Sequence, residues 1–124
     1  MLKNIEEVNI NKKITISVRS HIKLDDISDL LDTASRGASY WADCGKLGYS
    51  SVVNNILTRK ADECIRDTEE EKNYTLNIHK IKRGLTLMAK KEPSHFANFL
   101  KGDFDQTTGD IFLQFCLLGE IVYS

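Results

Sequence analysis

The chain has 124 residues, which fits one domain. Hydrophobic residues make up 41% and charged residues 28%, so collagen-like, low-complexity and strongly disordered classes are excluded. Seventeen basic and eighteen acidic side chains leave a net charge of −1, without the basic surplus typical of proteins that bind nucleic acid polymers.

The N-terminal part of the sequence predicts a polar arm followed by a strand. Residues 1–13 are polar and are expected to form an arm, with a single ligand-binding domain over residues 14–124. In the segment Ile14–Ser20, β-branched residues alternate with polar ones. This period of two predicts a half-buried strand.

The next segment predicts a helix that ends at Gly37. Asp25 or Asp26 is expected to cap its start, where acidic side chains suit the helix dipole, and Gly37 to stop it in a left-handed conformation. The residues that recur at helical spacing are Leu24, Ile27, Leu30, Leu31 and Ala34.

A glycine-rich loop, Ala38–Ser51, precedes a second predicted helix, which Ser50 or Ser51 is expected to cap. The predicted apolar stripe is Val52, Val53, Ile56, Leu57, Ala61, Cys64 and Ile65. The acidic run Asp67–Asn73 then predicts a solvated loop, and the alternation in Tyr74–Ile78 a second strand.

Three further helices are predicted in the C-terminal half. The first is capped by Asn77 and continues to about Lys91, the second is opened by Pro93, and the third contains Ile111 and is ended by Gly119. The last residues, 120–124, are expected to add to the sheet. The predicted fold is therefore α+β, a small antiparallel sheet packed with four or five helices in one domain.

The sequence offers little support for catalysis. The three cysteines form no C-x-x-C pair and the three histidines are scattered, so we expect no metal site. No nucleotide-binding glycine motif and no signature of a catalytic cysteine is present, so we expect no cofactor and no enzyme. The absence of a leader or a long apolar run predicts a cytoplasmic protein with no membrane association.

What remains is a set of residues suited to binding a nucleotide without turnover. Arg36 and Ser39 lie at a predicted helix end, where guanidinium and backbone amides hold phosphate, and Tyr40 and Trp41 can stack on a purine. The alternative for both aromatic residues is packing beneath the loop. Further candidates are Arg19 and Arg83 for phosphate, and Asp105, Thr107 and Gln114 for ribose hydroxyls or base edges.

Three stretches of the sequence, Asp25–Trp41, Arg83–Met88 and Gly109–Tyr123, resemble a known pattern. They are similar to the helix with a following "Y-W" pair, and to the final helix with "G-E-x-x-Y", of small phage proteins in the first family of Thoeris anti-defence proteins. The resemblance spans roughly residues 14–124.

The resemblance implies a sponge that acts in the host bacterial cytoplasm. Such proteins bind a cyclic ADP-ribose isomer made by bacterial TIR-domain enzymes and hold it without degrading it, so the Thoeris effector is not activated. Members form homodimers, and some assemble further and bind cyclic oligonucleotides at separate sites.

The residues also predict a homodimer, because the last helix carries apolar side chains on more than one face. Two other functions stay open. One is an enzyme that cleaves a cyclic nucleotide. The other is a phage protein that inhibits a host defence protein by direct contact, for which the acidic stretch Asp62–Glu71 could imitate a polyanion.

Overall fold

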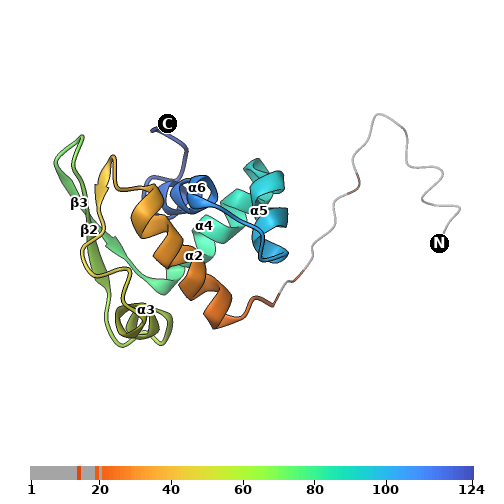
Figure 1. Ribbon diagram of the computed structural model, residues 1–124, viewed down its shortest axis with the longest axis horizontal. Helices are drawn as coiled ribbons and strands as arrows, with labels where there is room; N and C mark the ends of the chain where they lie inside the picture. The colour runs from red at the N-terminus through yellow and green to blue at the C-terminus, as the bar shows by residue number, and fades with distance from the viewer. Residues whose placement is uncertain (1–13, 15–18, 20) are drawn as a thin grey trace, which may run out of the picture.

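The described residues, 14, 19 and 21–124, form five helices and one three-stranded antiparallel sheet in this computed structural model (Figure 1). The α+β class and the number of helices agree with the sequence-based prediction. In chain order the elements are α2 (Leu24–Gly37), β1 (Ala42–Asp43), α3 (Ser50–Leu57), β2 (Glu63–Asp67), β3 (Lys72–Leu76), α4 (Ile78–Lys91), α5 (Pro93–Leu100) and α6 (Gln106–Leu117).

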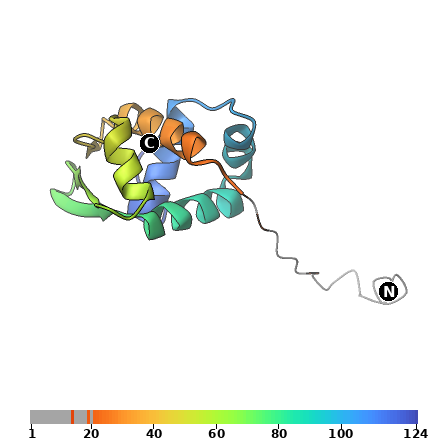
Figure 2. The same ribbon diagram turned by 90° about the horizontal axis from the view of Figure 1, so that it is seen from below.

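Helix α6 lies at the centre of the molecule, between α2 and α4 (Figure 2). Every residue from Thr108 to Leu117 is buried, whereas a helix on the surface buries only one stripe. The apolar side chains of this helix, which motivated the expectation of a homodimer, are therefore covered within one chain. Ile121 and Val122, which were counted with them, lie in the tail and are 40% and 55% exposed, and the homodimer stays a prediction.

Two glycines let α2 and α6 approach closely. A Cβ atom on Gly109 would lie 2.7 Å from the backbone nitrogen of Ala34, and one on Gly37 would lie 2.1 Å from the carbonyl oxygen of Gln106. The prediction that Gly37 stops α2 in a left-handed conformation is wrong, since its φ is not positive. Gly37 is required instead by the backbone that lies against it.

Helix α2 begins without a side-chain cap. Its N-cap residue is Lys23, and Asp25 and Asp26 lie inside the first turn, so the predicted capping role is wrong. Both carboxylates still lie near the positive end of the helix dipole. The predicted stripe is buried except for Leu24, which is exposed.

Helix α3 is shorter than predicted. Its N-cap residue is Tyr49, so neither Ser50 nor Ser51 takes that position, and the helix ends at Leu57. Arg59 follows with a φ of 64°, a left-handed conformation that prevents the helix from continuing.

The residues predicted to extend this helix form a β-hairpin. Strands β2 and β3 pair in antiparallel register, with Cys64 opposite Thr75 and Asp67 opposite Lys72. Ile65 is buried in the strand, whereas Cys64, predicted to be a core residue, is exposed. The acidic run is part of the hairpin and not a separate loop: residues 68–71 form its exposed turn, whereas Asp67 is buried at the end of β2.

The C-terminal half agrees more closely with the prediction. Asn77 caps α4 by accepting a hydrogen bond from the backbone nitrogen of Lys80 at 2.9 Å, and Pro93 opens α5. Helix α6 contains Ile111, as predicted, and Gly119 follows it with a φ of 76°. Within the described ranges, none of the helices has both the length and the hydrophobicity of a membrane span.

The two terminal predictions have different outcomes. The predicted polar arm and most of the strand Ile14–Ser20 lie outside the described residues; Ile14 and Arg19 are described, and both are exposed and outside any strand. The prediction that the tail, residues 120–124, adds to the sheet is wrong, because it pairs with no strand. A side chain of α6 holds it instead.

Candidate functional site

A buried carboxylate, that of Asp110, gathers three side chains. Tyr40 donates its hydroxyl to Oδ2 at 2.5 Å, and Trp41 Nε1 and Gln114 Nε2 donate to Oδ1 at 2.7 and 3.0 Å. Asp110 is 8% exposed, and Trp41 and Gln114 are fully buried. A buried carboxylate is stable only when hydrogen-bond donors compensate for its lost hydration, as these three side chains do. The bonds tie the loop after α2 to the central helix.

Gln114 uses its whole side-chain amide inside the fold. Its Oε1 accepts from the backbone nitrogens of Val122 and Tyr123 at 2.7 and 2.9 Å. Its Nε2 donates to Asp110 and to the carbonyl oxygen of Tyr123, both at 3.0 Å. Both donors and both acceptor positions are occupied. The predicted contact with a ribose or a base would therefore require Gln114 to give up one of these bonds.

Tyr123 joins this cluster to a second buried carboxylate. Its ring stacks on Trp41, with centroids 5.2 Å apart and planes inclined by 22°. Its hydroxyl donates to Asp67 Oδ2 at 2.7 Å, and this bond raises the pKa of Tyr123 well above its usual value. Asp67 also accepts from the backbone nitrogens of Glu69 and Glu70 in the hairpin turn. The C-terminal tail is thus fastened to both α6 and the hairpin.

The two aromatic candidates have different environments. Trp41 is fully buried under Tyr123, so it takes the alternative role of packing beneath the loop and offers no free face for a purine. Tyr40 is 45% exposed. Partial burial, followed by the hydrogen bond to Asp110, raises the pKa of Tyr40 to about 12.

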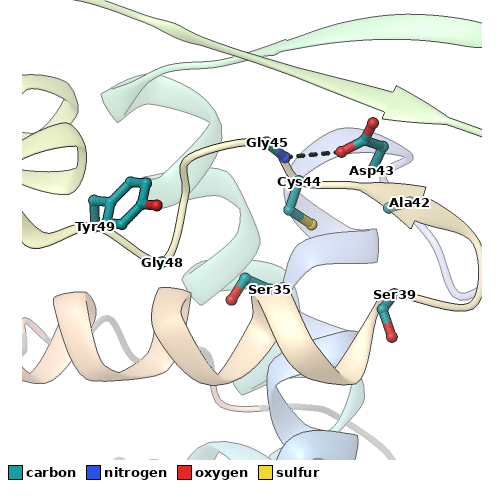
Figure 3. A pocket seen from close by; sticks show the side chains of 8 residues that line it. All are labelled: Ser35, Ser39, Ala42, Asp43, Cys44, Gly45, Gly48 and Tyr49. Carbon is teal, nitrogen blue, oxygen red and sulfur yellow. Dashed lines mark hydrogen bonds between the residues drawn. The ribbon is translucent and has the colours of Figure 1, made fainter.

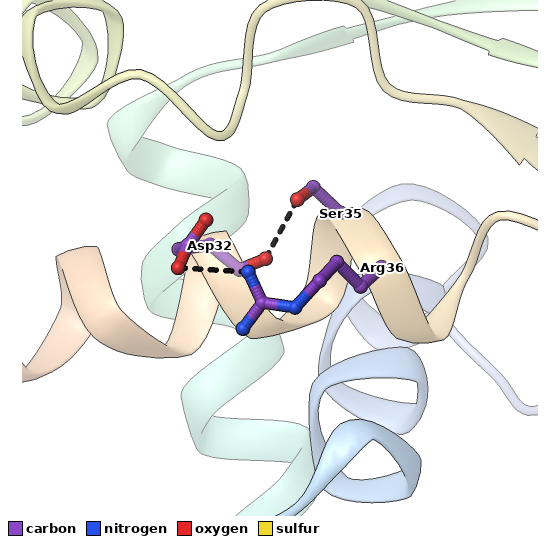
Figure 4. A network of polar contacts seen from close by, with 3 residues as sticks. All are labelled: Asp32, Ser35 and Arg36. Atoms are coloured by element: carbon purple, nitrogen blue, oxygen red, sulfur yellow. Dashed lines mark hydrogen bonds and ion pairs between the residues drawn. The ribbon is translucent and has the colours of Figure 1, made fainter.

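Arg36 lies on the surface in the last turn of α2 (Figure 4). Its Nη1 pairs with Asp32 Oδ2 at 3.0 Å, and the two side chains are 54% and 46% exposed. An exposed pair one helical turn apart contributes only about 0.3–0.5 kcal/mol. The guanidinium can therefore exchange this partner for a phosphate at small cost.

The other two predicted arginines lie elsewhere. Arg83 donates to the carbonyl oxygen of Cys116 at the end of α6, where a positive charge stabilises the helix dipole. Arg19 is exposed, ahead of α2. The three arginines thus occupy separate parts of the molecule.

Asp105 and Thr107 lie at the start of α6. Asp105 caps the helix by accepting from the backbone nitrogen of Thr108 at 3.1 Å, and this bond lowers the pKa of the Asp105 carboxyl. The Thr108 hydroxyl is 2.8 Å from His95 Nδ1, so α5 supports the cap. Thr107 is exposed. The first role of Asp105 is structural.

A pocket lies between the C-terminal half of α2 and the loop that follows β1 (Figure 3). Its volume is about 320 Å³, within the range of small-molecule sites. Ser39 is the one predicted ligand residue that lines it, and the glycine-rich loop forms its outer wall. The lining residues are Ser35, Ser39, Ala42, Asp43, Cys44, Gly45, Gly48 and Tyr49.

Two lining residues were missed as candidates from the sequence. Tyr49 is 64% exposed and is the aromatic side chain at the pocket, in the place expected for Trp41. Asp43 contributes a carboxylate from β1. The signal for Tyr49 was its position directly after Gly48 in a glycine-rich loop, where a side chain has few neighbours to pack on.

Cys44, in the pocket wall, is not an activated thiol. Burial, and next the charge of Asp43, raise its pKa to about 12. Because the thiolate is the reactive form, Cys44 stays protonated and unreactive at neutral pH. Among the residues that the structure describes, no three His, Cys, Asp or Glu side chains are grouped so as to hold a metal ion.

Two other hollows have volumes of about 390 and 300 Å³. The larger lies beside α2 and carries Asp26 and Asp29, and the smaller lies between the hairpin and the tail and carries Glu70. Neither contains a residue predicted to bind ligand. The pocket between α2 and its following loop is therefore the candidate site.

No family model, curated protein or solved structure matches this chain. Its function is therefore inferred from its residues and their geometry.

Proposed function

We propose that this chain is a phage anti-defence sponge. In the host bacterial cytoplasm it binds a cyclic ADP-ribose isomer made by TIR-domain enzymes and holds it intact, so that the Thoeris effector stays inactive. Two things support the proposal: the resemblance of three sequence segments to the first family of Thoeris anti-defence proteins, and the open pocket beside α2.

The pocket is the observation that carries the proposal. It combines hydroxyl and carboxylate groups with the exposed ring of Tyr49, on which a purine can stack. Each wall has an exposed cationic residue next to one of its lining residues in the sequence. Arg36 follows Ser35 on α2, and Lys46 follows Gly45 in the loop. Base, ribose and phosphate each have a suitable partner there.

Binding without turnover fits the same residues. The Cys44 thiol is protonated, and the carboxylates of Asp67 and Asp110 are buried and engaged by several donors each. A general base must have a free lone pair that reaches its substrate. These groups serve the fold. The carboxylate at the pocket is that of Asp43, and turnover there would release a hydrolysed product, which the experiment below detects.

The proposal includes a homodimer, as the resemblance implies. The pocket of one chain is small for a ligand with a purine, two riboses and two phosphates, and a subunit interface deepens a site. It also includes the cyclic oligonucleotides that some members bind, at a separate site.

The decisive experiment is capture of the signal. The pure protein is incubated with small-molecule extract from TIR-activated cells and washed, and the retained compound is released by heat and identified by mass spectrometry. An intact cyclic ADP-ribose isomer, one per site, supports the sponge. A hydrolysed product would indicate an enzyme, and an empty protein would overturn the proposal.

An inhibitor of a host protein is the second candidate. The hairpin turn exposes Glu69, Glu70 and Glu71 side by side, as an acidic protein mimic would. Native mass spectrometry separates the two functions. A sponge gains the mass of a nucleotide from extract, whereas an inhibitor gains the mass of a protein and loses that complex when the three glutamates are changed to glutamine.

A further inference from the structure

The side-chain oxygens on the α2 wall of the pocket are hydrogen-bond acceptors only. Ser35 donates its hydroxyl proton to the carbonyl oxygen of Asp32 at 2.6 Å, and Ser39 donates to that of Arg36 at 2.9 Å. A serine hydroxyl has one proton to donate, so both are committed to the helix backbone. What these oxygens offer to a ligand is their lone pairs.

The carboxylate of Asp43, at the loop wall, adds two more acceptors. Its Oδ1 accepts from the backbone nitrogen of Gly45 at 3.0 Å (Figure 3). Within the described part of the chain, its Oδ2 has no hydrogen bond, and the side chain is exposed. An ionised carboxylate donates nothing. Apart from the weak thiol donor of Cys44 and the hydroxyl of Tyr49, the lining side chains only accept.

This lining selects one part of a nucleotide and rejects another. A phosphate brings negative charge and acceptor oxygens, so beside Asp43 it would face a like charge, with only the Tyr49 hydroxyl and the weak Cys44 thiol as side-chain donors. A ribose brings adjacent hydroxyl donors without charge, and a carboxylate can accept from both. The same pairing of an acidic side chain with ribose hydroxyls recurs in dinucleotide-binding folds.

We propose that this pocket holds the ribose diol and base of the ligand and leaves its phosphates outside. Asp43 accepts from the diol, the base stacks on Tyr49, and the phosphates lie in solvent against Arg36 and Lys46. The assignment rests on the proposed function for the identity of the ligand, but it concerns any ribonucleoside of this chemistry.

The first test uses simple probes and the full chain labelled with ¹⁵N. Adenosine is expected to shift the backbone amide signals of Ser39 and the Cys44–Tyr49 loop. 2′,3′-Dideoxyadenosine, which keeps the base and lacks the diol, is expected to bind at least about tenfold more weakly. Inorganic phosphate at the same concentration should leave the signals of Ser39, Cys44 and Tyr49 in place and shift only those of Arg36 and Lys46. Equal binding of both nucleosides, or a larger response to phosphate, overturns the proposal.

The second test removes one charge. Asp43→Asn keeps an acceptor for Gly45 but weakens the pairing with the diol, so adenosine affinity should fall about tenfold while the affinity for 2′,3′-dideoxyadenosine changes little. Asp103→Asn is the matched control, because Asp103 is an exposed aspartate outside the pocket. If Asp43→Asn binds adenosine as the control does, Asp43 does not hold the diol.

These tests separate the inference from the proposed function. Diol-dependent adenosine binding, with no signal captured from TIR-activated cells, would leave the pocket assignment standing and overturn the sponge. Capture of the cyclic signal, with no adenosine response at Ser39 and the loop, would leave the sponge standing and overturn the assignment.

Discussion

Gln114 holds the backbone of Tyr123 on both sides. Its side-chain oxygen accepts from the Tyr123 nitrogen at 2.9 Å, and its side-chain nitrogen donates to the Tyr123 carbonyl at 3.0 Å. One side chain thereby makes the pair of bonds that a neighbouring strand makes in an antiparallel sheet. The tail is ordered in this way without joining the sheet.

Gln114→Glu is expected to destabilise the protein by roughly 3 kcal/mol or more at pH 7. It replaces a donor by a second carboxylate oxygen beside Asp110 and the Tyr123 carbonyl, which leaves buried acceptors facing one another. Urea unfolding at pH 7 measures the loss. Gln106→Glu, at the exposed start of α6, is the matched control and should be neutral or stabilising.

Trp41→Ala is expected to cost about 3–5 kcal/mol of stability, as truncation of a large core side chain does. Tyr40→Ala should cost less, since Tyr40 is 45% exposed. If Trp41 were instead an exposed platform for the ligand, its truncation would cost little stability and would mainly weaken ligand binding. Thermal unfolding without ligand, with affinity measured per folded molecule, decides between the two roles. A stable Trp41→Ala variant that no longer captures ligand would restore the platform role.

Gly109→Ala is expected to destabilise the protein by about 1–3 kcal/mol. This loss is expected even though alanine has a helix propensity about 1 kcal/mol better than that of glycine. The added methyl group would collide with backbone atoms of Ala34 and Thr33 in α2. Unfolding by urea gives the sign. A stabilised variant would show that α2 and α6 do not approach as closely as described.

Arg36→Glu is expected to abolish ligand capture and to lower the melting temperature only slightly, through loss of the exposed pair with Asp32. Arg36→Lys is expected to weaken capture, because only arginine grips phosphate with two parallel bonds. Arg83→Glu should instead lower the melting temperature, since Arg83 caps the end of α6. The measurement is protection of a purified Thoeris effector at equal protein dose. Full protection by Arg36→Glu would remove Arg36 from the site.

Tyr40 makes the stability depend on alkaline pH. Its pKa is about 12 in the folded protein and 10.0 when unperturbed, so the folded state holds the proton more tightly. The contribution of the protonated Tyr40 hydroxyl to the free energy of unfolding is complete below pH 10 and is lost as the pH rises from 10 to 12. Tyr40→Phe should therefore be less stable than the wild type at pH 9, and the gap should narrow by pH 12. A gap that is constant over this range would contradict the assigned bond to Asp110.

The helices with a local signal were predictable from the sequence. The stripe of α2, the Asn77 cap of α4 and Pro93 at the start of α5 depend on neighbours within a few residues. Such signals are contained in a short window of sequence, because spacing and capping act over one or two helical turns.

The first strand of the hairpin, β2, could not be found in this way, whereas the alternation in Tyr74–Ile78 found part of β3. Cys64 and Ile65 continue the helical spacing of α3, and only the pairing of β2 with β3 places them in a strand. A similar limit applies to Gly37, whose need for a bare Cα comes from the backbone at Gln106, far along the chain. Contacts between segments far apart in the chain produce no periodic pattern in the sequence of either segment.

The sequence by itself determined the fold class, most helices and a list of residues able to bind a nucleotide. Only the tertiary structure decided which of them reach solvent. Trp41 and Gln114 have the right chemistry, but the central position of α6 and the fastening of the tail bury both. Tyr49 and Asp43 line the pocket because the loop folds back on α2. Burial depends on every element at once, and residue type alone does not reveal it.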